Sequence, residues 1–160
     1  MSLPAVRPAV VEDATGIARV HIQAWRETYS HLVEPGELDG LSVDRRRDRW
    51  AALVGIGEPV VWVATVDGQI VGFASTRVGG DDAPRPRELS GLYVLAARHG
   101  SGAGQSLLEA AIGDSPAFLT VAADNPRAQA FYRRNRFELD GHTENHVLVR
   151  TPVTVVRMVR

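Results

Sequence analysis

The chain has 160 residues, with 18 Lys and Arg against 19 Asp and Glu, so it is long enough for a buried core and carries a net charge of only −1. That balance favours neither nucleic acid nor an anionic membrane as a partner. There is no cysteine, and all 18 basic residues are arginine, which excludes thiolate chemistry, disulfides, a lysine Schiff base and a Walker A loop.

The first half of the chain predicts a strand, two helices and a hairpin, in the order Ala5–Ala9, a helix after Glu12, Asp44–Leu53, and Val60–Val66 with Gln69–Val78. The first helix begins beside two acids, and its apolar residues Ile17, Val20 and Ala24 recur at helical spacing. Asp67-Gly68 joins the hairpin strands, and this pair suits a type I′ turn.

The second half alternates strands with helices, in the order Leu89–Leu95, Gln105–Ile112, Ala117–Ala122, a helix opened by Asn125-Pro126, Phe137–Leu139 and Val153–Val159. We therefore expect one α/β (α+β) domain over residues 1–160, with a mixed, mostly antiparallel sheet of about six to seven strands flanked by helices. No stretch reaches the roughly 20 apolar residues of a membrane span, and charged residues interrupt the N-terminal segment, so we expect a cytoplasmic protein.

A glycine-rich turn between a strand and a helix is the first functional motif. The strand ends near Leu95, and His99-Gly100-Ser101-Gly102-Ala103-Gly104 leads into the helix at Gln105. Glycines let the backbone N–H groups approach a ligand closely, and the helix N-terminus favours an anion such as a phosphate or pyrophosphate. On this segment alone, a βα turn without a ligand and a dinucleotide-binding oxidoreductase stay open, although the GxGxG spacing differs from the Rossmann GxGxxG.

A second motif follows some thirty residues later, in the segment from Asn125 to Phe137. It has the form N-x-x-A-x-x-F-Y-x-x-x-x-F. With the upstream strand and glycine turn, it resembles the GCN5-related N-acetyltransferase (GNAT) family, across the whole chain in element order and most closely from Leu89 to Phe137.

The resemblance implies that acetyl-CoA is the co-substrate, with its pyrophosphate on the glycine turn and its pantetheine along the preceding strand. By match, the cofactor-binding residues are Val94, Leu95, His99, Gly100, Ser101, Gly102, Ala103, Gly104, Gln105 and Asn125. Transfer would go directly to a primary amine of a small molecule or peptide in a ternary complex. The absence of cysteine suits direct transfer, because no acetyl-cysteine intermediate is available.

The resemblance also implies catalytic roles. Tyr132 matches a tyrosine that protonates the departing CoA thiolate in many members, and Glu88 stands where some members place a base. The alternative interpretations are that Tyr132 is simply a core residue and that Glu88 is an exposed carboxylate at the end of a strand. Trp25 and Tyr29, four residues apart on the first helix, form a candidate aromatic wall for the acceptor, although such pairs more often serve packing.

Two positions depart from the family pattern. His99 stands where Gln or Arg usually begins the turn, and Arg136 replaces the glycine that usually ends the second motif. The five histidines show no metal-ligand spacing, so we expect no metal. The main alternative function is a non-catalytic module that binds or senses acyl-CoA, and the sequence is compatible with a homodimer.

Overall fold

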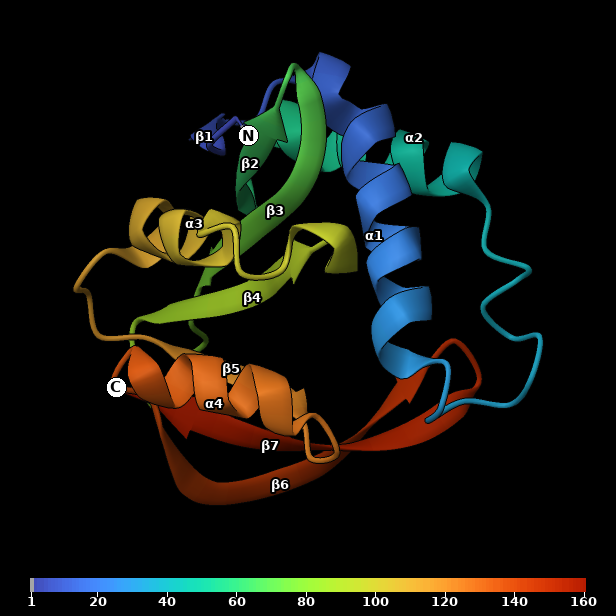
Figure 1. Cartoon of the computed structure of the whole chain (residues 1–160). Coiled ribbons are helices and arrows are strands. Elements are labelled where there is room, and N and C mark those ends of the chain that lie inside the picture. The colour runs from blue at the N-terminus through green and yellow to red at the C-terminus, as the bar shows by residue number, and fades with distance from the viewer. Residues whose placement is uncertain (1) are drawn as a thin grey trace.

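The computed structural model describes residues 2–160, which form one seven-stranded sheet with four α-helices around it (Figure 1). The elements are β1 (Ala5–Pro8), α1 (Ala14–Tyr29), α2 (Val43–Ile56), β2 (Val60–Val66), β3 (Gln69–Val78), β4 (Arg87–Val94), α3 (Ala103–Ile112), β5 (Phe118–Ala122), α4 (Pro126–Arg134), β6 (Glu138–Leu148) and β7 (Thr151–Val159). None of the helices described in this range is long and apolar enough to cross a bilayer.

The strand order is β1-β2-β3-β4-β5-β7-β6, and every neighbouring pair is antiparallel except β4 with β5. Helices α1 and α2 pack on one face of the sheet, around Val63 and Phe73, and α3 and α4 cover the other, around Leu119 and Met158. The predicted mixed, mostly antiparallel sheet is confirmed. This sheet does not support the alternative of a dinucleotide-binding oxidoreductase, because a Rossmann domain needs a mostly parallel sheet.

The hairpin has the predicted bounds, and its turn residues Asp67 and Gly68 have φ of 50° and 79°, as a type I′ turn requires. The prediction for the sixth strand was wrong in length: it covered Phe137–Leu139, whereas β6 has 11 residues. Ten of the eleven are exposed, so this edge strand lacks the alternating apolar pattern that marks a strand in a sequence.

Strand β4 carries an irregularity that matters for the site. Ser75 of β3 pairs with Gly91 and Thr76 with Leu89, so Ser90 has no residue opposite it, the pattern of a β-bulge. A bulge bends its strand. On its other edge β4 pairs with β5 at a single position, Glu88 with Phe118, and beyond that the two strands separate.

Shortly after the end of α4, the backbone takes a conformation that is unfavourable for the arginine found there. Arg136 has φ of 70°, in the left-handed region that costs an L-residue about 1–2 kcal/mol. The guanidinium of Arg136 contacts Asp114 Oδ1 at 2.6 Å, but both side chains are largely exposed, at 67% and 95%. Exposed ion pairs contribute about 0–1 kcal/mol, so this one offsets only part of the strain.

We therefore predict that Arg136→Gly raises the free energy of unfolding by about 0.5–1 kcal/mol and the Tm by about 1–4 °C. Urea and thermal denaturation measure both quantities. Arg133→Gly, inside the same helix, is the matched control and should lower stability by about 1 kcal/mol. A lower Tm for Arg136→Gly would show that the ion pair outweighs the backbone strain.

Candidate active site

The separation of β4 from β5 opens a cleft of about 630 Å³. Strand β4 forms one wall and Thr120 and Val121 of β5 the other, while the C-terminal half of α1, the turn before α3, and α4 close the remaining sides. Beyond Glu88, the β5-facing edge of β4 has no strand partner among residues 2–160, so its peptide groups, apart from the Val94 carbonyl that contacts His99, are available to an extended ligand.

The glycine turn presents free backbone donors to this cleft. Gly100 and Gly102 have φ of 80° and 88°, which glycine adopts without strain, and their N–H groups have no acceptor within the described residues. Gly104 and Gln105 lie in the first turn of α3, where N–H groups have no partner within the helix. These four amides and the helix dipole suit an anion.

Other predicted cofactor residues organise the turn. His99 Nε2 lies 3.0 Å from the carbonyl oxygen of Val94, and its Nδ1 contacts the guanidinium of Arg127, so both ring nitrogens already have partners. Gln105 Nε2 donates to Glu109 and, at 2.9 Å, to Asn135, which ties α3 to the end of α4.

Asn125 caps α4 as its sequence predicted, because its side-chain oxygen accepts the N–H of Ala128 at 3.1 Å. Ser101 Oγ accepts the N–H of Ala103 at 3.3 Å. Of the predicted cofactor residues, Leu95 and Ser101 do not line the cleft, and Leu95 packs instead on the α1 side of the sheet. The remaining eight do line it: Val94, His99, Gly100, Gly102, Ala103, Gly104, Gln105 and Asn125.

Three tyrosines line the cleft: Tyr29 of α1, Tyr93 of β4 and Tyr132 of α4. Tyr132 is 8% exposed and packs edge-to-face on Phe131 and Phe137, so it belongs both to the core and to the cleft wall. Burial raises the pKa of the Tyr132 phenol, with a smaller contribution from the nearby Tyr93. Its hydroxyl therefore keeps its proton at neutral pH, as a proton donor must.

Two other predicted site residues, the candidate base Glu88 and the candidate acceptor residue Trp25, do not line the cleft. Glu88 lies near the start of β4, at the one position where β4 pairs with β5, and it does not line the cleft. Trp25 packs edge-to-face on Tyr29, with ring centroids 5.9 Å apart, and does not line the cleft either.

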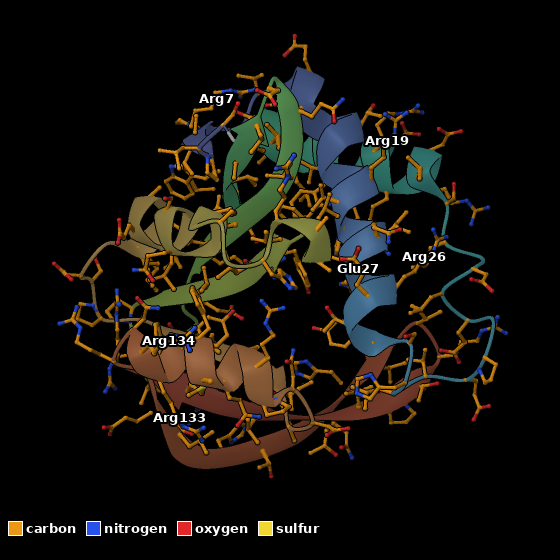
Figure 2. All side chains as sticks on the ribbon, viewed as in Figure 1. Arg7, Arg19, Arg26, Glu27, Arg133 and Arg134 are labelled. Carbon is orange, nitrogen blue, oxygen red and sulfur yellow. The ribbon has the colours of Figure 1, made fainter. Side chains whose placement is uncertain are left out.

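Four charged residues of the cleft wall escaped the sequence analysis: Glu27, Arg98, Arg127 and Arg134. Glu27 is the only acid among the described lining residues; it reaches from α1 toward the segment after β4, where its Oε2 accepts the N–H of Ala96 at 2.8 Å (Figure 2). In the sequence Glu27 looks like a solvated helix position, whereas Arg98 directly precedes the glycine turn, and Arg127 and Arg134 occupy unspecified positions of the second motif.

Comparison with known proteins agrees with this architecture. The model of the acetyltransferase (GNAT) family matches residues 21–137. The chain belongs to this family. It is 33% identical to the uncharacterized N-acetyltransferase YuaI of Bacillus subtilis, over 76% of this chain and 73% of that protein.

Solved structures of the GNAT fold cover nearly the whole chain. PaiA N-acetyltransferase of Thermoplasma acidophilum, solved with coenzyme A, has a TM-score of 0.74 at 16% identity, over 98% of both chains. YncA of Salmonella typhimurium, solved with acetyl-CoA, has a TM-score of 0.70 at 19% identity, over 99% of this chain and 94% of that one. The GNAT family uses acetyl-CoA as co-substrate, so the chain is an acetyl-CoA-dependent acyltransferase.

In this GNAT domain, a half-buried histidine, His21, packs between α1 and the sheet. His21 contacts the rings of Trp25, Trp50, Phe73 and Tyr93, and its Nδ1 accepts the indole N–H of Trp50 at 3.1 Å. Burial, followed by the charges of two nearby arginines on α2, lowers its pKa from 6.5 to about 3. His21 is therefore neutral at physiological pH.

This depressed pKa predicts a pH-dependent stability. Between pH 6.5 and about 3 the unfolded chain binds a proton at His21 that the folded chain does not, so stabilisation is complete above pH 6.5 and is lost as the pH falls. From pH 7 to pH 5 the wild type should lose on the order of 1–2 kcal/mol more than His21→Asn, which keeps an acceptor for Trp50. Urea denaturation at both pH values tests this, and equal losses would contradict it.

Proposed function

We propose that this acetyltransferase moves the acetyl group directly from acetyl-CoA to a primary amine of a small molecule or peptide, in a ternary complex. The observation that supports the proposal is the meeting of three features in one cleft: an unpaired edge of β4, a turn with free amides, and the protonated phenol of Tyr132. Direct transfer needs both substrates in the cleft together, and cysteine is absent. An acetyl-CoA turnover assay over a panel of primary amines tests the activity.

The described residues fit acetyl-CoA. The free N–H groups of Gly100 and Gly102 suit the pyrophosphate, and a Cβ at either glycine would have no neighbour within 4 Å, which leaves space for a ligand. The free edge of β4 suits the amides of pantetheine, and Arg98, Arg127 and Arg134 add positive charge around the cleft. Acetyl-CoA supplies an activated thioester there.

Gly102→Val tests the cofactor site. The side chain would stand where the pyrophosphate is expected to approach the backbone, so acetyl-CoA affinity should fall well over tenfold. Gly36→Val is a matched control, because Gly36 also has a positive φ, of 84°, with open space around a Cβ, but lies in the loop between α1 and α2.

Both variants should be destabilised by a similar amount, and only Gly102→Val should lose acetyl-CoA in calorimetry. Unchanged affinity in a folded Gly102→Val protein would end the assignment of the turn to the pyrophosphate.

Tyr132 is the proposed general acid. Its phenol is positioned by the packed rings of Phe131 and Phe137 and keeps its proton, so it is suited to protonate the thiolate of CoA as it leaves. A thiol with a pKa near 8.5 is already a fair leaving group, so the contribution should lie at the low end of the usual range for general acids.

Tyr132→Phe removes the hydroxyl and keeps the ring, so we predict a single-turnover rate about ten- to a hundredfold lower, with acetyl-CoA affinity little changed. Single-turnover kinetics separates chemistry from product release. Tyr93→Phe, which removes another phenol from the same cleft, should change the rate less. A wild-type rate in Tyr132→Phe would return Tyr132 to a packing role.

Two carboxylates compete for the role of base. Glu88 has the position that the family resemblance implies, whereas Glu27 lines the cleft, and for that reason we infer that Glu27 accepts the amine proton. Glu27→Gln keeps an acceptor for the Ala96 N–H and should lower kcat/KM about tenfold or more for an amine with a pKa near 10, but less for an α-amine near 8.

Raising the pH toward the pKa of the amine should restore the rate of Glu27→Gln, because the amine then loses its proton to water. Glu88→Gln, measured in parallel, should behave as wild type. The reverse pattern would assign the base to Glu88.

A further inference from the structure

A second hollow, of about 580 Å³, lies where the α1–α2 loop meets α2, and all of its charged lining is positive. Its lining is Gly40, Leu41, Ser42, Arg45, Arg46 and Arg49. Within residues 2–160, none of these three arginines has a carboxylate oxygen within 4.0 Å. The acids of the same helix are committed elsewhere, because Asp44 and Asp48 both contact Arg47.

Arg46, one of the arginines that line this hollow, is in an unfavourable environment for a charge. Arg46 is half-buried, and burial, followed by the charge of Arg49, lowers its pKa. Arg46 Nη1 lies 3.4 Å from His21 Nδ1, but His21 is neutral and supplies no negative charge. Positive groups that are close together and partly removed from water favour an anion, and a guanidinium binds a carboxylate or phosphate with paired hydrogen bonds.

Aromatic side chains lie between the hollow and the cleft, which share no lining residue. The guanidinium of Arg46 stacks 5.0 Å from the centre of the Trp25 ring, and Trp25 packs edge-to-face on Tyr29, which lines the cleft. Arg46 also lies near Tyr93, another cleft residue: burial raises the pKa of the Tyr93 phenol, and the charge of Arg46 partly opposes that rise. Tyr93 packs with the α1-side cluster, while the next residue, Val94, packs with the α3-side cluster, so α2, which carries Arg46, and α3, which follows the glycine turn, pack on opposite faces of the sheet.

We propose that this hollow binds an anionic group of the acceptor, and that the acceptor is therefore an amine that carries a carboxylate or a phosphate, with Arg46 as its principal contact. The inference rests on the proposed acetyl transfer to an amine. Arg45 and Arg49, which are exposed, add positive charge to the lining of the hollow. The amine of such an acceptor would lie toward Tyr29 and Tyr93, and its anion toward Arg46.

Matched pairs of amines test the acceptor class. L-phenylalanine is compared with 2-phenylethylamine for the carboxylate, and O-phosphoethanolamine with ethanolamine for the phosphate. The wild type should show kcat/KM at least about tenfold higher for the anionic member of one pair, and the pair that shows it identifies the anion. Equal or lower values for both anionic members would overturn the inference.

Three variants test the residue. Arg46→Gln should reduce the preference for the anionic member about tenfold or more, Arg46→Lys should retain part of it, and Arg47→Gln, the control outside the hollow, should leave it unchanged. Thermal denaturation and acetyl-CoA affinity establish that each variant is folded. If Arg46→Gln does not fold, Arg49→Gln replaces it, with a smaller loss expected. A preference that survives loss of the charge would overturn the assignment.

Calorimetry with L-phenylalanine and O-phosphoethanolamine in the presence of CoA separates this inference from the proposed function, because binding needs no turnover. Binding that Arg46→Gln weakens, without turnover of any amine, would support the anion site and reject the transferase activity on these amines. Turnover of amines without anionic preference would support the transferase and overturn the anion site. Neither binding nor turnover would overturn both.

Discussion

The departure of β4 from β5 is the feature on which the rest of the site depends. Two neighbouring strands of a continuous sheet would satisfy each other's peptide groups and leave no room for a ligand. Here they share a single register pair, Glu88 with Phe118, and the bulge at Ser90 bends β4 immediately afterwards. Because of that separation, the free edge of β4, the glycine turn that follows β4, and helix α4 all line one cleft.

The alternation of side chains along β4 divides the site into two compartments. Val94 packs with the α3 and α4 cluster, and Tyr93 packs with Phe73 and His21 on the α1 side. Successive residues of a strand point to opposite faces, so one strand can separate a region for CoA from a region for the acceptor. The thioester is expected where both regions reach the free edge.

Unusual backbone conformations occur both where a ligand is expected and where none is. Gly100 and Gly102 adopt positive φ without cost and expose their amides to the cleft, whereas Arg136 adopts φ of 70° at the end of α4 and bears a steric cost. The chain tolerates that cost because Tyr132 O, at the end of the same helix, accepts the N–H of Phe137 at 3.0 Å, and Phe137 is fully buried. The helix end therefore positions the ring against which Tyr132 packs.

The sequence by itself determined the features that depend on near neighbours. Helical spacing, the Asp67-Gly68 turn, the Asn125-Pro126 cap and the glycine turn are all local, and together they predicted the sheet, the helices and the family. The tertiary structure decided what long-range contacts bring together. Glu27 enters the cleft through a hydrogen bond to a residue 69 positions away, and Arg46 reaches His21 across 25 positions and stacks on Trp25. Strand β6 exists because β7 supplies its pairing partners rather than because its residues are apolar. Such contacts leave no periodic signal in the chain, because their energy depends on burial and on partners that only the folded molecule supplies.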